Sequence, residues 1–137
     1  MILLWNLRLV GLMLAILGLA HAYFPRRFGW HEECQRLEPL TREIHFVHNA
    51  YIGLFCVLNG LLCLFLAPDL LQPSRLAAGI LIGLLVFWGS RLVVQLFVYS
   101  RDLWRGKRFE TGVHILISLF WLDLSVTFGA AAWHQFA

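Results

Sequence analysis

Hydrophobic residues form four long runs along this chain, at about residues 3–22, 44–66, 76–99 and 112–133. A helix needs roughly 20 predominantly apolar residues to cross the hydrocarbon layer of a bilayer, and each run meets that length. The connectors between the runs are too short to fold as a separate soluble domain. The pattern therefore predicts an all-α membrane protein, a four-transmembrane-helix antiparallel bundle that forms a single domain over residues 1–137 and has the lipid bilayer as its principal partner.

Polar residues recur at helical spacing within the second run. Read as a helix, this run places one stripe of side chains along a single face: His45, His48, Asn49, Ile52, Cys56, Asn59 and Cys63. Lipid offers polar side chains no hydrogen-bond partner, so a polar stripe in a membrane helix faces other protein or water. We therefore expect this face to point into the bundle.

The other three runs also carry a distinctive face. The first has a ridge of mostly small residues, which lets another helix approach closely: Arg8, Gly11, Ala15, Gly18 and Ala22. The third has a polar and aromatic stripe: Trp88, Arg91, Gln95 and Tyr99. The fourth has a similar one: Thr111, His114, Ser118, Trp121 and Ser125. A charge such as Arg91 inside a span needs a partner or a wet cavity, and Asp123 is its candidate partner, with Arg8 competing for that carboxylate.

A depth estimate brings these stripes to one level. At 1.5 Å per residue, six polar side chains fall within roughly 8 Å of the same membrane boundary: His21, His45, His48, Gln95, Tyr99 and His114. Arg91 lies deeper, at about 12 Å. We therefore predict a histidine-rich intramembrane pocket that opens toward the cytoplasm and whose ligand-binding residues are His48, His114, Gln95, Arg91, Tyr99, His45 and His21.

Two kinds of ligand suit such a pocket, because inward faces of helical bundles are where cofactor sites are built. Haem b requires two opposed imidazoles, and His48 with His114 are the candidate metal ligands, with Arg91 available for the propionates. A quinone or another amphipathic molecule requires hydrogen bonds from His48, Gln95 or His114 and stacking on Trp88 or Trp121. Under this hypothesis the protein binds a redox cofactor (haem or quinone) or an amphipathic small molecule and transfers electrons or protons, either as a small redox protein or as a subunit of a larger membrane complex.

The alternative is a structural or assembly protein without a cofactor. In this interpretation the histidines sit at the wet edge of the bilayer, and Asn49, Asn59 and Gln95 hold helices together through hydrogen bonds worth on average about 0.6 kcal/mol each. The chain has no Gly-rich phosphate loop, no Gly-x-Ser-x-Gly turn and no His-Glu-x-x-His motif. The sequence therefore does not decide whether the protein is an enzyme.

Composition and charge set the membrane topology. The chain is 60% hydrophobic and 14% charged, with a net charge of +3. Eight of its 11 Lys and Arg residues lie in the first and third connectors: Arg26, Arg27, Arg36, Arg42, Arg101, Arg105, Lys107 and Arg108. The positive-inside rule then places these connectors in the cytoplasm and both termini on the non-cytoplasmic side of a cytoplasmic-type (inner or plasma) membrane. The positive charge is thus a topology signal, and we expect no nucleic-acid partner.

The first run has a competing interpretation as a secretory signal, because Leu9 to Leu19 is apolar and Ala20-His21-Ala22 has the form of a cleavage site. Arg8 is the only charge preceding that segment, so we expect the helix to be retained. Cys56 and Cys63 are separated by roughly 10 Å along a helix, too far for a disulfide. They are expected to be small core residues.

Overall fold

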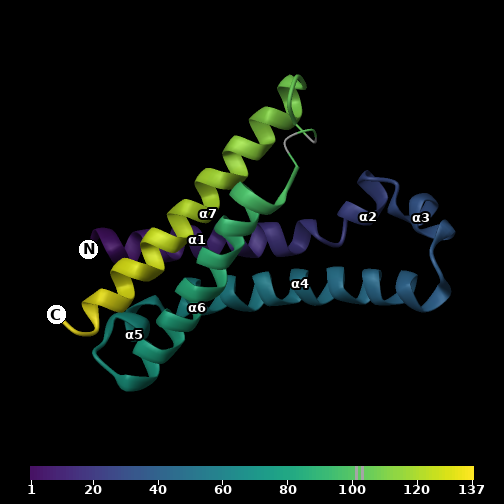
Figure 1. The fold of residues 1–137 in the computed structure, drawn as a ribbon. Helices are drawn as coiled ribbons and strands as arrows, with labels where there is room; N and C mark the ends of the chain where they lie inside the picture. Colours follow the sequence, from purple (N-terminus) through teal and green to yellow (C-terminus); the bar gives the residue numbers. More distant parts are fainter. Residues whose placement is uncertain (101, 103) are drawn as a thin grey trace. The chain divides into compact units, whose positions relative to one another are not determined.

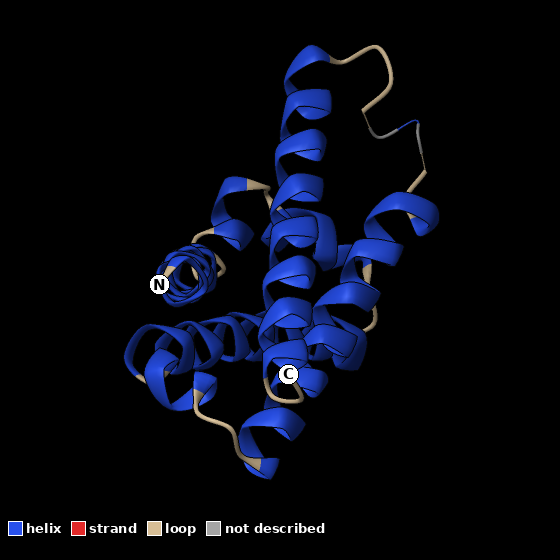
Figure 2. Cartoon of the chain, turned by 90° about the vertical axis from the view of Figure 1, so that its left-hand side faces the viewer, coloured by secondary structure: helices blue, strands red, loops and turns tan. Residues whose placement is uncertain are grey.

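The computed structural model describes residues 1–100, 102 and 104–137, and in these the chain forms helices, turns and loops without any strand (Figure 2). Four helices are long: α1 (Ile2–Ala20), α4 (Pro39–Phe65), α6 (Arg75–Val93) and α7 (Arg108–His134). Each of them, α6 together with the π-helical turn η2 (Val94–Val98), is long and apolar enough to cross a membrane. The predicted all-helical chain with four candidate spans is confirmed. Arg101, which entered the charge count, lies outside the described residues.

Two of these helices start earlier than the hydrophobic runs. α4 begins at Pro39, whose fixed φ suits the first position of a helix, after Glu38 in an extended conformation. α7 begins at Arg108 and has Glu110 in its first turn, where a negative charge favours the positive end of the helix dipole. Polar residues therefore extend both helices beyond their apolar segments, which hydrophobicity alone did not show.

The first connector consists of short helices. They are α2 (Phe24–Arg27), α3 (Trp30–Glu33) and the 3-10 turn η1 (Cys34–Arg36). Gly29 separates α2 from α3 with φ 65°, a left-handed conformation that glycine adopts without a steric penalty. A further short helix, α5 (Ala67–Leu71), joins α4 to α6.

The chain divides into two compact units. One contains Arg8–Ala67 and is called the α1–α4 unit; the other contains Met1–Leu7 with Pro68–Ala137 and is called the α6–α7 unit. Helix α1 thus contributes its first residues to the α6–α7 unit and the remainder to the α1–α4 unit.

Glycines bring α1 and α4 together in the α1–α4 unit, where the two helices lie side by side (Figure 1). A Cβ atom placed on Gly60 would lie 2.7 Å from the backbone oxygen of Gly11 and 2.7 Å from the backbone nitrogen of Ala15. A Cβ on Gly18 would lie 2.6 Å from the carbonyl oxygen of Gly53. The helix backbones are therefore in direct contact, and the predicted small-residue ridge of α1 is confirmed at these positions.

The buried face of α4 differs from the predicted polar stripe. Its buried residues are Asn49, Gly53, Cys56, Asn59, Gly60 and Cys63. Asn49, Asn59 and the two cysteines were expected there, whereas His45, His48 and Ile52 are exposed. These three lie outside the face that contacts α1, because Gly53 and Gly60 set the close approach of α1 and the face centred on those glycines does not include them. Their place in a ligand site stays a prediction.

In the α6–α7 unit, α6 packs along α7 (Figure 1). The indoles of Trp88 and Trp121 stack with centroids 5.2 Å apart at an interplanar angle of 16°. Near the end of α7, the Gln135 side chain donates to the Leu70 carbonyl (2.9 Å) and accepts from the Ser74 amide (3.0 Å). These contacts fix the start of α6 against the end of α7.

Candidate functional site

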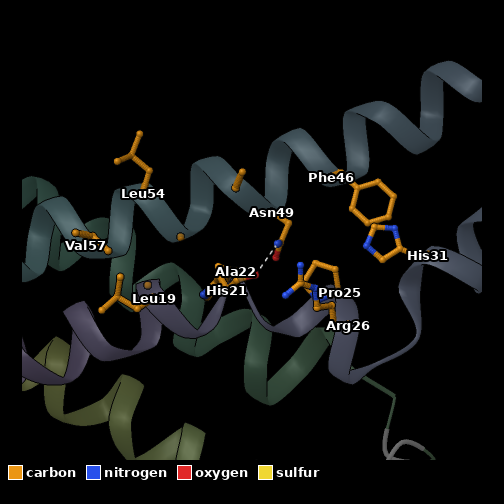
Figure 3. A pocket seen from close by; sticks show the side chains of 13 residues that line it. Leu19, His21, Ala22, Pro25, Arg26, His31, Phe46, Asn49, Leu54 and Val57 are labelled. Carbon is orange, nitrogen blue, oxygen red and sulfur yellow. Dashed lines mark hydrogen bonds between the residues drawn. The ribbon is translucent and has the colours of Figure 1, made fainter.

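The α1–α4 unit contains a pocket of about 600 Å³ (Figure 3). Its lining comes from the end of α1, the first connector and the first half of α4: Gly18, Leu19, His21, Ala22, Pro25, Arg26, His31, Phe46, Asn49, Ala50, Gly53, Leu54 and Val57. A concave site lined mainly by apolar groups with a few polar ones is the usual form of a small-molecule site. We therefore take this pocket as the candidate functional site.

Small residues and one proline create the pocket. Gly18, Ala22, Ala50 and Gly53 carry little or no side chain, and the contact between Gly18 and Gly53 holds α1 against α4 at the wall of the pocket. Helix α1 ends at Ala20, and α2 begins at Phe24 with the buried Pro25 as its second residue, so the chain changes direction there. The His31 imidazole of α3 stacks on the Phe46 ring of α4, with ring centroids 4.7 Å apart and an interplanar angle of 17°. This contact joins the connector to α4 at the pocket.

His21 links the two helices at the pocket. Its Nδ1 lies 2.8 Å from the Leu17 carbonyl oxygen, and because a carbonyl only accepts, Nδ1 carries the proton. The second ring nitrogen, Nε2, is then an acceptor in the neutral imidazole and a donor in the protonated one. The backbone oxygen of His21 accepts a hydrogen bond of 3.0 Å from the Asn49 amide. Asn49 therefore joins α4 to the end of α1, as predicted.

The pocket is polar at one end and apolar at the other. Arg26 and His31 lie toward the connector, whereas Leu19, Leu54 and Val57 lie at the opposite end (Figure 3). From Phe46 to Val57 the α4 axis rises roughly 16 Å. The pocket therefore suits an amphipathic ligand in both its length and the difference in polarity between its ends.

Among the predicted site residues of this unit, His21 alone lines the pocket. His45 is exposed and meets the Trp30 ring edge-on at 4.9 Å. His48 is exposed and is not part of the lining. Conversely, Arg26 and His31 line the pocket although we did not predict them. The connector sequence carried one signal for this change of direction, Pro25, which lies in α2 shortly after α1 ends.

The four predicted site residues of the α6–α7 unit form two contacting pairs. Gln95 and the Nδ1 atom of His114 are 2.7 Å apart, so this pair joins the two helices, as predicted for Gln95. Arg91 donates to the Tyr99 hydroxyl at 3.2 Å. Its guanidinium also lies 5.6 Å from the ring centroid of Tyr99 and 5.6 Å from that of Trp121. These contacts of Arg91 are with aromatic side chains and do not include the predicted partner Asp123.

Two further observations complete this polar contact. The His114 imidazole stacks on the Trp104 indole, with ring centroids 3.7 Å apart and an interplanar angle of 8°. The third connector therefore covers part of the first turns of α7. Gln95 is buried within the π-helical turn, a local irregularity that is frequent at functional sites. Gln95 and His114 are hydrogen-bond partners of each other, so this contact is complete without a ligand.

Metal-binding geometry is not apparent in the part of the chain that the structure describes. Among residues 1–100, 102 and 104–137, no group of three or more His, Cys, Asp or Glu side chains is placed to hold a metal ion. His48 belongs to the α1–α4 unit and His114 to the α6–α7 unit, so neither unit by itself contains the proposed haem pair. Coordination of haem by these two histidines stays a prediction.

Comparison of the chain with protein-family models, with curated proteins and with solved structures finds no match, so the pocket is interpreted from its own chemistry.

Proposed function

We propose that this integral membrane protein binds an amphipathic small molecule in the pocket of the α1–α4 unit. The polar part of the molecule lies beside Arg26 and His31, and its apolar part extends along α4 toward Val57. The graded polarity of the pocket is the observation that supports this proposal.

The proposal includes the topology of the chain. The four spans alternate in direction, both termini lie outside, and the basic first and third connectors face the cytoplasm. Arg26 belongs to the first connector, so the polar end of the pocket opens at the cytoplasmic boundary of the membrane. A ligand then enters from the inner leaflet with its headgroup at the water interface.

The polar end of the pocket determines which amphiphile binds. Moving an apolar chain from lipid into an apolar protein pocket removes little surface from water, so the hydrophobic effect contributes little to binding within a bilayer. Hydrogen bonds and charge at the headgroup then decide which amphiphile binds. A quinone is one such molecule, and with it electron or proton transfer would be the associated chemistry.

A scaffold without a ligand is the second candidate, and the helix contacts favour it. The glycine contacts between α1 and α4 and the bonds made by Asn49 and Gln95 are what an assembly protein needs to hold its spans together. Its basic connectors would then contact another membrane subunit. The two candidates differ in one property, the saturable binding of a small molecule.

Pocket filling separates the two candidates. Ala50 lines the pocket, whereas Ala130 is exposed on α7 and is not in the lining. We expect the wild type and Ala130→Trp in lipid nanodiscs to bind one amphiphile saturably, tested with decylubiquinone and with dodecanoate, and Ala50→Trp to lose this binding. Native mass spectrometry counts the bound molecules, and circular dichroism checks the helix content of each variant. Equal binding by both variants, or saturable binding by none of the three proteins, would contradict the proposal.

A further inference from the structure

We propose that the ligand of this pocket is an anionic amphiphile, a carboxylate or phosphate ester with one apolar chain, and that Arg26 selects its charge. This inference rests on the proposed function and adds the chemical class of the ligand.

The charge of the lining is the first argument. Arg26 is the one permanently charged side chain among the lining residues, and neither Asp nor Glu is found there. The two acidic residues of α3, Glu32 and Glu33, are exposed and do not line the pocket. The polar end therefore presents a positive charge that the pocket itself does not neutralise.

The hydrogen-bonding groups around Arg26 are the second argument. His31 stacks on Phe46 through its ring face, which leaves the in-plane N–H of the imidazole available to a ligand. The guanidinium of Arg26 offers several donors in a planar fork that matches the oxygens of a carboxylate or phosphate. The polar end thus offers donors that suit a headgroup with oxygen atoms and negative charge.

Location at the membrane boundary is the third argument. Pro25, which precedes Arg26, is buried at the end of the pocket, so the arginine is held where α1 has just ended and α2 begins. Leu54 and Val57 line the pocket along α4 at increasing distance from the connector. A single-chain anion would lie with its charge at Arg26 and its chain beside these two residues.

The test compares three molecules that share a twelve-carbon chain: dodecanoate, dodecyl phosphate and the uncharged dodecanol. Affinities are measured for the wild type, Arg26→Gln and Arg27→Gln in nanodiscs of zwitterionic lipid. Arg27 is the matched control, because it is adjacent, basic and exposed but not part of the lining. Charge-assisted hydrogen bonds of this kind predict a loss of about tenfold or more for the preferred anion in Arg26→Gln. We expect less than a twofold change in Arg27→Gln and in dodecanol binding.

The outcomes distinguish this inference from the function on which it rests. Preference for dodecanoate or for dodecyl phosphate identifies the headgroup, and either preference supports the inference if Arg26→Gln removes it. Saturable binding of dodecanol that equals that of both anions, abolished by Ala50→Trp and unchanged by Arg26→Gln, would overturn the anionic class and keep the pocket. Absence of saturable binding for all three molecules and for decylubiquinone would overturn the proposed function as well.

Discussion

Replacement of Gly60 by alanine tests the helix contact that forms the α1–α4 unit. The added Cβ would lie 2.7 Å from atoms of Gly11 and Ala15, whereas ordinary van der Waals contact begins at 3.4 Å. The backbones of α1 and α4 must therefore separate by roughly 0.7 Å at this point. Overpacking of this kind costs about 1–3 kcal/mol, while glycine to alanine in a helix otherwise gains about 0.5–1 kcal/mol. We expect a net loss of about 1 kcal/mol in the free energy of unfolding.

Gly79→Ala is the matched control on α6. A Cβ at Gly79 would meet no atom within 4 Å in the part of the chain that the structure describes. Only the propensity gain remains, so this variant should be more stable than the wild type by up to about 1 kcal/mol. The assay is reversible unfolding by sodium dodecyl sulfate in mixed micelles, followed by far-ultraviolet circular dichroism.

The two substitutions are chemically identical and differ only in their surroundings, so their effects should have opposite signs. A Gly60→Ala protein that is stabilised as much as Gly79→Ala would refute the backbone contact between α1 and α4. The pocket would then lose its structural basis, because Gly18 and Gly53 form its wall through the same helix contact.

Three further predictions concern hydrogen bonds and topology. Asn49→Ala removes the bond from α4 to the His21 carbonyl and should lower the free energy of unfolding by about 0.6 kcal/mol, measured in the same micelle assay; a loss of zero would mean that the bond does not form. Gln135→Ala removes both bonds to the segment preceding α6 and should cost about 1 kcal/mol; hydrogen exchange should then increase at the start of α6, and unchanged exchange there would contradict the contact. A membrane-impermeant maleimide should label Lys107→Cys from the cytoplasmic side and Gln72→Cys from the other side, with low background because the three native cysteines are buried. Labelling of both positions from one side would overturn the topology.

Hydrophobic periodicity predicted the four spans well because length and apolar composition are properties of each run by itself. Polarity alone did not indicate which face of α4 contacts α1. His48 and Asn49 are neighbours in sequence and both polar, yet only Asn49 is buried. The decisive factor was the pair Gly53 and Gly60, which set where α1 touches α4. A search for glycines at helical spacing on α4, matching Gly11 and Gly18 on α1, would have given the correct face.

The candidate site was harder to predict for a related reason. Its polar end depends on how the first connector folds back, and the connector meets α4 where His31 stacks on Phe46. Contacts between a short irregular segment and a helix leave no periodic signal in the sequence. By contrast, Gln95 and His114 lie on stripes of regular spacing, and the structure joins them.

Photolabelling tests whether the pocket of the α1–α4 unit holds an amphiphile. The probe is a fatty acid with a diazirine near the end of its chain, applied to the protein in nanodiscs with and without excess unlabelled dodecanoate, and the modified residues are mapped by mass spectrometry. If the pocket holds the fatty acid, the competitor suppresses labelling at Leu54, Val57 and Leu19, while labelling of exposed α7 residues such as Leu116 is unchanged. Labelling that the competitor reduces equally at Leu116 and Leu54, or at neither, would contradict the account.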